Sequence, residues 1–254
     1  MTYARFAYVY DELMQDAPYD NWLELMEKHK SEVQPSMQSI LDLGCGTGTL
    51  TVELGKKGFQ LIGLDNSADM LVLASEKSRD ARVPIQWLEQ DMREIELVEK
   101  VDTIVCFCDS LNYITSEEDV QAVFQSVSAN LKEEGYFIFD VHSLFKMREI
   151  FGDHTFASAE DKTSLIWQCF WEEEEYLIEH QLTFFHQTEE LLYERFDETH
   201  VQKAYEIEDL CTWLSEAGFK IASISADFEY QEPQEKSERI IITAQKREKN
   251  VSKG

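Results

Sequence analysis

Residues 40–48 place the strongest constraint on the fold of this chain. They read Ile-Leu-Asp-Leu-Gly-Cys-Gly-Thr-Gly, a short apolar run that breaks into a glycine loop. Because glycine has no Cβ, the loop can adopt positive φ values and approach a ligand closely. A helical pattern follows up to Lys57, and Gly58 marks its end. A buried strand, a glycine loop and a helix in this order predict an α/β fold with a ligand at the loop.

The alternation of strands and helices continues along the chain. The other expected strands are 60–64, 85–88, 103–107, 136–141, 220–226 and 239–245, and the other expected helices are 68–79, 117–131 and 207–217. This spacing predicts right-handed crossovers. We therefore expect an α/β, Rossmann-like, doubly wound sheet of seven mostly parallel strands with helices on both faces.

Two segments depart from this alternation. Residues 151–205, after the fifth strand, show a period of two, as in Leu165, Trp167 and Cys169, which predicts an antiparallel β insert. Residues 1–34 have a helical pattern, with Asp20 as the expected N-cap of a helix over 21–30. We expect an N-terminal helical cap (1–34), a ligand-binding core (35–150 and 206–247) and the insert (151–205) as a lid.

The chain is strongly acidic. Its 254 residues include 50 Asp and Glu against 23 Lys and Arg, a net charge of −27. This surplus repels phosphate backbones and anionic lipids, so nucleic-acid and membrane-surface binding are disfavoured. The sequence has neither a signal-peptide pattern nor an apolar run of the ~20 residues that cross a bilayer. It predicts a cytoplasmic protein with reduced thiols, either a monomer or a homodimer.

The spacing of the loop glycines excludes two common nucleotide sites. A dinucleotide-binding Gly-x-Gly-x-x-Gly loop would place glycine at 49 or 51, where threonine stands, and a P-loop would need Gly-Lys-Ser/Thr. A nicotinamide-dependent oxidoreductase is therefore disfavoured. A metal site is not expected either, because Cys106 and Cys108 have no His or Cys partners nearby.

Two acids accompany the glycine loop. Asp65 ends the second strand, 21 positions after Gly44, where a carboxylate in a doubly wound sheet can accept two hydrogen bonds from a ribose diol. A nucleoside ligand is therefore expected. Asp42 is expected to order the loop and face a cationic group of the ligand, and a second role, capping the backbone N–H groups of the loop, is compatible with the first.

Further motifs follow the loop in a set order. Gly-Leu-Asp-Asn-Ser-Ala-Asp-Met stands at 63–70, Gln-Asp-Met at 90–92 and Leu-Ser-Glu-Ala-Gly-Phe at 214–219. With the loop, they resemble the class I S-adenosylmethionine-dependent methyltransferases. The N-terminal Phe-Ala-Tyr-Val-Tyr-Asp-Glu-Leu-Met at 6–14 and the insert are similar, more narrowly, to the small-molecule methyltransferases of the bacterial YqeM-like group. The resemblance implies S-adenosyl-L-methionine as cofactor and a small-molecule acceptor.

The resemblance also implies a set of cofactor-binding residues. The glycine loop is expected to line the methionine part, Asp65 to bind the ribose hydroxyls, and Asp91 to accept a hydrogen bond from the adenine amine. The whole expected set is Tyr10, Asp42, Gly44, Cys45, Gly46, Asp65, Asn66, Met70, Asp91, Met92 and Cys106. Structural roles stay open for three of them: an N-cap for Asp91, a core contact for Met70 and helix docking for Tyr10.

The acceptor is expected after the fourth strand, at the edge where open α/β sheets place their ligands. Asp109 and Tyr113 follow that strand, and Asp140 and His142 come at the end of the fifth, so these four are the candidate bases or orienting groups; Asp109, Tyr113 and His142 are the expected catalytic residues. Methyl transfer from a sulfonium needs little acid–base chemistry, because the leaving group is already activated by its charge. Alternatives that stay open are an RNA or protein methyltransferase and a catalytically silent S-adenosylmethionine-binding protein.

Acidic residues are concentrated in the insert. Residues 151–205 include thirteen acidic and three basic side chains, which favours a cationic or amine acceptor. The acidic run at 172–175 has a second interpretation, as the solvated turn of a hairpin.

Overall fold

The structure is a computed structural model that describes residues 2–15, 17–160, 162–188 and 190–248. The side chains of residues 2–6 and 8, with Phe6 and Tyr8 of the N-terminal motif, lie outside the described residues. The helices are α1 (Thr2–Leu13), α2 (Tyr19–Lys28), α3 (Thr49–Lys56), α4 (Ala68–Ala81), α5 (Glu117–Asn130) and α6 (Ile207–Glu216), with shorter turns η1 (His29–Val33), η2 (Ser110–Tyr113) and η3 (Lys146–Phe151). The strands are β1 (Ser39–Leu43), β2 (Gln60–Asp65), β3 (Ile85–Glu89), β4 (Val101–Cys106), β5 (Leu131–His142), β6 (Thr155–Ala159), β7 (Thr163–Glu172), β8 (Leu177–Gln187), β9 (Tyr193–Lys203), β10 (Phe219–Ala226) and β11 (Arg239–Lys246).

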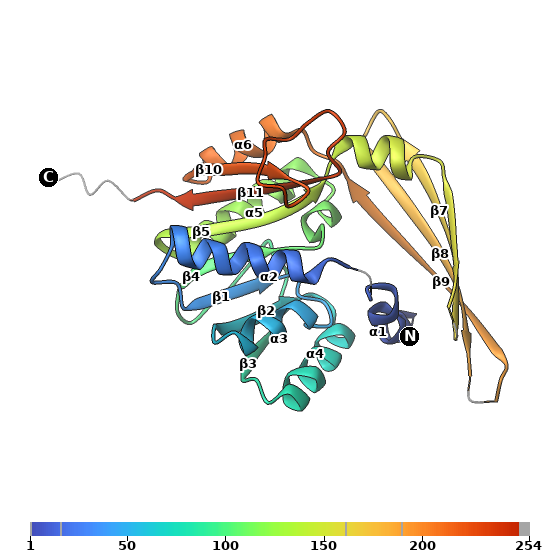
Figure 1. Cartoon of the computed structure of the whole chain (residues 1–254). Coiled ribbons are helices and arrows are strands. Elements are labelled where there is room, and N and C mark those ends of the chain that lie inside the picture. Colours follow the sequence, from blue (N-terminus) through green and yellow to red (C-terminus); the bar gives the residue numbers. More distant parts are fainter. Residues whose placement is uncertain (1, 16, 161, 189, 249–254) are drawn as a thin grey trace, which may run out of the picture.

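Seven of the strands form one sheet in the order β10-β11-β5-β4-β1-β2-β3. β1 pairs in parallel with β2 and β4, whereas β11 runs antiparallel to both β5 and β10. The predicted Rossmann-like, mostly parallel sheet is therefore confirmed. The strand order reverses beside β1 (Figure 1), and open α/β sheets bind their ligands at the carboxyl ends of the strands at such a point.

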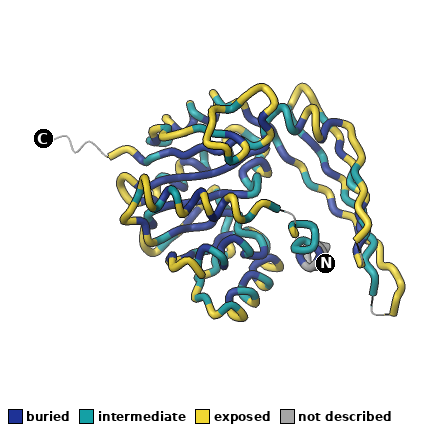
Figure 2. The backbone as a smooth tube through the Cα atoms, in the orientation of Figure 1, coloured by how far each residue is buried: buried dark blue, intermediate teal, exposed yellow. Residues whose placement is uncertain are grey.

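Helices cover both faces of this sheet, because successive side chains of its central strands point to opposite sides. Phe137 and Phe139 of β5 pack on Phe124 of α5 in one buried cluster, while Ile138 belongs to a second cluster that includes Trp22 of α2. Figure 2 shows the central strands buried over most of their length. This packing on both faces holds the strand ends that surround the site.

A second, four-stranded antiparallel sheet, β6-β7-β8-β9, follows β5 and confirms the predicted insert. Its long strands stand beside the main sheet, with α1 between the two (Figure 1). Val9 of α1 and Met70 of α4 share a buried cluster with Phe184 and Phe196 of the insert, whose rings are stacked. One face of the insert is thus covered by the N-terminal helix.

The start of α2 differs from the one predicted from the sequence. α2 begins at Tyr19 with Pro18 at the N-cap position, so the predicted capping role of Asp20 is wrong. Asp20 lies in the first turn, where a carboxylate still interacts favourably with the helix dipole. No helix in the described part of the chain is both long and apolar enough to cross a bilayer.

Candidate active site

A cavity of about 520 Å³ lies at the carboxyl edge of β1, β2 and β4; we call it the loop cavity. Its walls come from the glycine loop, the start of α4, the segments after β3 and β4, and α1. The loop cavity is lined by eight of the eleven expected cofactor-binding residues, namely Tyr10, Gly44, Gly46, Asp65, Asn66, Met70, Asp91 and Met92. Residues far apart in the sequence therefore share one site.

The glycine loop bends sharply around this cavity. Gly44 and Gly46 have φ values of +72° and +53°, and the N–H groups of Gly44 and Cys45 donate to the Leu64 carbonyl oxygen at 2.8 and 3.0 Å. A Cβ on Gly44 would lie 2.8 Å from Cβ of Ser110. Glycine is therefore required at position 44, and the loop backbone can closely approach a ligand.

Asp65, at the end of β2, holds the loop from the opposite side. Its Oδ2 accepts from the Gly46 N–H at 2.8 Å, and its Oδ1 accepts from the Ser67 N–H at 2.9 Å. Burial raises the pKa of Asp65, although the backbone hydrogen bonds oppose the shift. Each carboxylate oxygen can accept a further hydrogen bond. Asp65 therefore fits the expected role of binding two ribose hydroxyls.

Asp42 and Cys45 lie around a separate cavity of about 40 Å³ next to the loop. Asp42 is buried, and its Oδ2 accepts from the Thr51 hydroxyl at 2.6 Å. Burial raises the pKa of Asp42 to about 6, against the effect of the Thr51 hydrogen bond. The capping role considered for Asp42 is wrong, because the N–H groups of Gly44 and Cys45 donate to Leu64 instead.

The far end of the loop cavity is formed by α4 and the segment after β3. Met70 and Met92 line it together with Asp91 and Arg93. Asp91 accepts from Arg93 at both oxygens, Oδ1 from Nε at 2.9 Å and Oδ2 from Nη2 at 2.6 Å. Hydrogen bonding from Arg93 lowers the pKa of Asp91. The Asp91 carboxylate is thus ionised and held against the Arg93 guanidinium.

Cys106 does not take the position expected of it. It is the last residue of β4, is wholly buried in the core, and is absent from the described linings of the loop cavity and the small cavity. Beyond it, Cys108 and Asp109 have φ values of 55° and 52°, and this turn places Cys108 in the cavity wall. The strand period could not reveal this, since positive φ is uncommon outside glycine.

A second cavity, of about 380 Å³, lies between the core, α1 and the insert; we call it the insert cavity. All three residues expected at the acceptor, Asp109, Tyr113 and His142, line it. It shares five lining residues with the loop cavity, namely Tyr10, Met14, Asp109, Tyr113 and His200. The two cavities therefore meet at these side chains.

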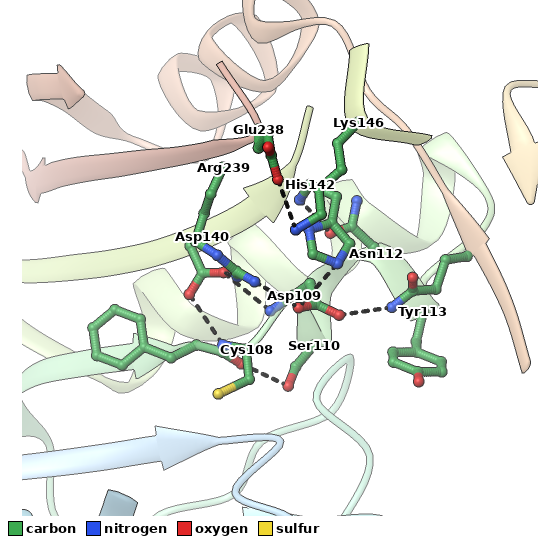
Figure 3. A network of polar contacts seen from close by, with 12 residues as sticks. Cys108, Asp109, Ser110, Asn112, Tyr113, Asp140, His142, Lys146, Glu238 and Arg239 are labelled. Carbon is green, nitrogen blue, oxygen red and sulfur yellow. Dashed lines mark hydrogen bonds and ion pairs between the residues drawn. The ribbon is translucent and has the colours of Figure 1, made fainter. Parts of the chain in front are cut away.

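Asp109 is the centre of a polar network at this junction (Figure 3). Gln202 Nε2 donates to its Oδ2 at 2.9 Å, and its Oδ1 lies 3.2 Å from both His142 Nε2 and Arg239 Nη2. Burial favours a higher pKa, but His142, Arg239 and Gln202 outweigh it and hold the pKa of Asp109 below its usual range. Asp109 is therefore an ionised carboxylate whose donors are already supplied by the protein.

Asp140 of β5 fixes the backbone that carries this network. Its buried carboxylate accepts from the N–H groups of Cys108 and Asp109 at 3.0 and 3.1 Å and from Trp22 Nε1 at 2.9 Å. It also forms an ion pair with Arg239. Because these donors come from α2, β11 and the turn itself, the positive-φ conformation at 108–109 is held from three directions.

His142 lies buried at the end of β5. Burial lowers its pKa to about 3, although Asp109 opposes the shift, so the ring is neutral near pH 7. The ionised Asp109 can only accept, which assigns the proton to Nε2 and a lone pair to Nδ1. Within the described part of the chain, Nδ1 is buried without a hydrogen-bond partner. An unpaired buried acceptor costs ~1–3 kcal/mol, so Nδ1 is suited to receive a hydrogen bond from a bound molecule.

Sequence reasoning missed the residues that tie the insert to this site. Gln202 Oε1 lies 3.3 Å from His180 Nε2, while Asn112 Nδ2 donates to the Lys203 carbonyl oxygen at 2.7 Å. The first contact lies within the insert, between β9 and β8, whereas the second, with the Gln202–Asp109 hydrogen bond, anchors the end of β9 on the core. Gln202 shares the face of β9 that carries His200, and this period of two is the one signal in the sequence that could have indicated it.

The other features of the insert have separate places. His180 lines the insert cavity and accepts from Trp167 Nε1 at 3.0 Å, while His186 contacts the Thr163 hydroxyl at 2.9 Å. The acidic run at 172–175 is exposed, at the end of β7 and in the turn before β8. This placement agrees with a solvated hairpin turn.

Comparisons with known proteins agree with this geometry. Residues 40–135 match the methyltransferase domain family. The putative methyltransferase YqeM of Bacillus subtilis is 44% identical over 253 residues, which cover 99% of this chain and all of that protein. A crystal structure of an S-adenosylmethionine-dependent methyltransferase from Clostridium acetobutylicum is similar with a TM-score of 0.88 and 31% identity, over 98% of this chain and all of the other.

A relative with a different named activity matches a shorter part of the chain. A dTDP-3-amino-3,4,6-trideoxy-alpha-D-glucopyranose N,N-dimethyltransferase of Streptomyces venezuelae is 32% identical over 40% of this chain and 41% of its own. The fold, the motif order and the near-complete match to YqeM lead to one assignment. The chain belongs to the class I S-adenosylmethionine-dependent methyltransferases, in the YqeM-like group, and its cofactor is S-adenosyl-L-methionine.

Proposed function

We propose that this methyltransferase transfers the methyl group to a nucleophile of a small molecule held in the insert cavity. The observation that carries the proposal is the junction of the two cavities at Asp109, Tyr113 and His200. A donor in the loop cavity and an acceptor in the insert cavity would meet there. The volume of about 380 Å³ also lies in the ~300–1,000 Å³ range of small-molecule sites.

On the cofactor side, we assign the methionine part to Gly44 and Gly46, the ribose to Asp65 with Asn66, and the adenine to the end of the cavity around Asp91. Their position in one cavity and the free acceptor capacity of Asp65 support these roles. When bound, S-adenosylmethionine supplies an electrophilic methyl group on a positively charged sulfur.

On the acceptor side, His142 positions the nucleophile. Its Nδ1 lone pair accepts a hydrogen bond from an N–H or O–H of the acceptor, while Asp109 holds Nε2 and fixes the ring. A ring with a pKa of about 3 is a weak base, so an amine acceptor would react in its neutral form and release its proton to solvent after methylation. Holding the nucleophile in line can supply up to ~7–11 kcal/mol of the barrier reduction.

Two alternatives are less well supported. An RNA acceptor would meet the net charge of −27, and an RNA or protein would have to insert its reactive group beneath α1 and the insert. The Streptomyces venezuelae relative is named for an amino-sugar acceptor, which supports a small molecule here. A catalytically silent protein would bind the cofactor and release no product.

Calorimetric titration with S-adenosylmethionine, followed by assays of S-adenosylhomocysteine release, tests the proposal. We expect cofactor binding and release with members of a panel of small amines, hydroxyls and carboxylates, and none with transfer RNA or unfolded protein. Release that requires RNA or protein would contradict the small-molecule acceptor. Cofactor binding without release on any substrate would favour the silent protein.

A further inference from the structure

The insert cavity has an aromatic and apolar body. Phe151, Phe156 and Trp167 line it, and Trp167 has its ring centroid 5.1 Å from those of both Phe151 and Phe156. Leu165 and Leu182 of β7 and β8 extend this wall. Such a surface favours an acceptor that can bury an apolar or planar body, since burial stabilises by roughly 25 cal/mol per Å² of apolar surface.

Positive charge is missing from the described part of the lining. Among the described residues that line the insert cavity, none is lysine or arginine. Arg239 is close by, but it pairs with Asp140 and Asp109, and Lys146 lies 3.5 Å from Glu238. These cations are therefore engaged with acids of the protein.

The imidazoles around the cavity do not replace the missing charge. Burial lowers the pKa of His142 to about 3 and that of His180 to about 4, and it also lowers the pKa of His200. Asp109 contributes a negative charge at the junction. A carboxylate or phosphate that entered this cavity would lose its hydration and find no cation in exchange, which is costly.

We infer that the methyl acceptor is an amine on an aromatic or other apolar body that carries neither a carboxylate nor a phosphate. This inference rests on the proposed function of the insert cavity as the acceptor site. The ring wall buries the body, and the amine lies at the junction with the loop cavity. At that junction Asp109, which lines both cavities, provides a negative local potential, and His142, which lines the insert cavity alone, accepts from the amine N–H through Nδ1.

Matched pairs of acceptors test the inference. Phenethylamine, tyramine and tryptamine are compared with phenylalanine, tyrosine and tryptophan, which differ from them by one carboxylate. We expect each amine to have a kcat/KM at least tenfold above that of its amino acid, measured by S-adenosylhomocysteine release. Calorimetric titration of the same compounds into the S-adenosylhomocysteine complex should show the same order of affinity.

A positive charge introduced into the wall of the insert cavity provides a second test of the inference. Ala157 of β6 is exposed and lines the insert cavity, whereas Ala159 is exposed on the same strand and is absent from the described lining. Ala157→Lys should lower the preference for amines over amino acids at least threefold, because its ammonium can pair with the carboxylate. Ala159→Lys should keep the wild-type ratio.

Three results would overturn the inference. One is an equal or higher kcat/KM for the amino acids, and another is an unchanged preference in Ala157→Lys that still folds and binds the cofactor. The third is a failure of all three amines to bind or react with a protein that binds S-adenosylmethionine normally. In that case S-adenosylhomocysteine release with other small acceptors would still support the proposed function. Release only with RNA or protein would contradict both the inference and the proposed function.

Discussion

Gln202 of β9 donates from Nε2 to Asp109 Oδ2 across 2.9 Å and so joins the insert to the segment after β4. At its other end, Gln202 Oε1 lies 3.3 Å from Nε2 of His180, whose Nδ1 accepts from Trp167 Nε1 at 3.0 Å. Because the Trp167 indole can only donate, every proton in this chain of hydrogen bonds is assigned. The chain runs from the wall of the insert cavity to its junction with the loop cavity.

Replacement of Gln202 should impair the acceptor side alone. We expect Gln202→Ala to lower kcat/KM about tenfold and to raise the pKa of Asp109, because a hydrogen bond to a charged group contributes ~1.5–3 kcal/mol. The Kd of S-adenosylmethionine should stay within twofold of wild type. Steady-state kinetics and calorimetry measure the two effects, with Gln181→Ala, at an exposed position of β8, as the matched control. An equal loss of cofactor affinity would instead show that Gln202 supports the whole site.

Asp65 should determine cofactor affinity. Asp65→Ala removes the acceptor of the Gly46 and Ser67 N–H groups and the proposed acceptor of two ribose hydroxyls. We expect the Kd of S-adenosylmethionine to rise at least tenfold, since each hydrogen bond to a charged group is worth ~1.5–3 kcal/mol. Asp69→Ala, in the exposed first turn of α4, is the control. Unchanged affinity in Asp65→Ala, with a normal thermal melting curve, would refute the ribose assignment.

The sequence predicted the parts of the molecule that depend on local pattern. The period of β1 to β5, the glycine loop and the acid that ends β2 are each encoded within a few residues. Because parallel strands bring their carboxyl ends to one edge, Gly44, Asp65 and Asp91 could be placed together without a structure. The alternation of residues within 151–205 likewise indicated the antiparallel insert.

The network around Asp109 could not be predicted in this way. Gln202 is 93 positions and Arg239 130 positions from Asp109, and no local pattern links them. Cys106 shows a second limit of prediction from local pattern. The sequence pattern extended the strand past Cys106, whereas in the structure a positive-φ turn, held by the buried carboxylate of Asp140, follows the strand directly. Such a turn depends on tertiary contacts and has no signature in residues 106–109.

Gly44 and Gly58 distinguish the effect of a left-handed backbone from that of a steric clash. Both have positive φ, +72° and +91°. A Cβ on Gly44 would lie 2.8 Å from Ser110 Cβ, whereas a Cβ on Gly58 would have no atom within 4 Å. We expect Gly44→Ala to weaken S-adenosylmethionine binding at least tenfold, and Gly58→Ala to leave it unchanged. Both should lower the free energy of unfolding by ~1–2 kcal/mol from the left-handed backbone alone. Equal cofactor affinities would show that Ser110 moves aside and that the close approach at Gly44 is not needed.

The buried histidines predict a loss of stability as the pH falls below neutral. The folded-state pKa of His142 is about 3, against an ordinary value of 6.5. The unfolded chain therefore binds a proton between these values that the folded chain does not. The full contribution is present above pH 6.5 and is lost toward pH 3, at up to ~1.4 kcal/mol per pH unit. His29 and His180, each with a folded-state pKa of about 4, act in the same direction. Asp42, whose pKa is raised to about 6, acts in the opposite direction.

Comparison of wild type with His142→Gln isolates one of these contributions. Thermal denaturation in half-unit steps from pH 7.5 to pH 5 should show a steeper fall in Tm for wild type, because glutamine does not titrate. His154→Gln, at an exposed position of the insert, should reproduce the wild-type slope. If His142→Gln also keeps that slope, the imidazole binds a proton in the folded protein. Its folded-state pKa would then not be lowered, and the assignment of a ring that stays neutral down to pH 5 would be wrong.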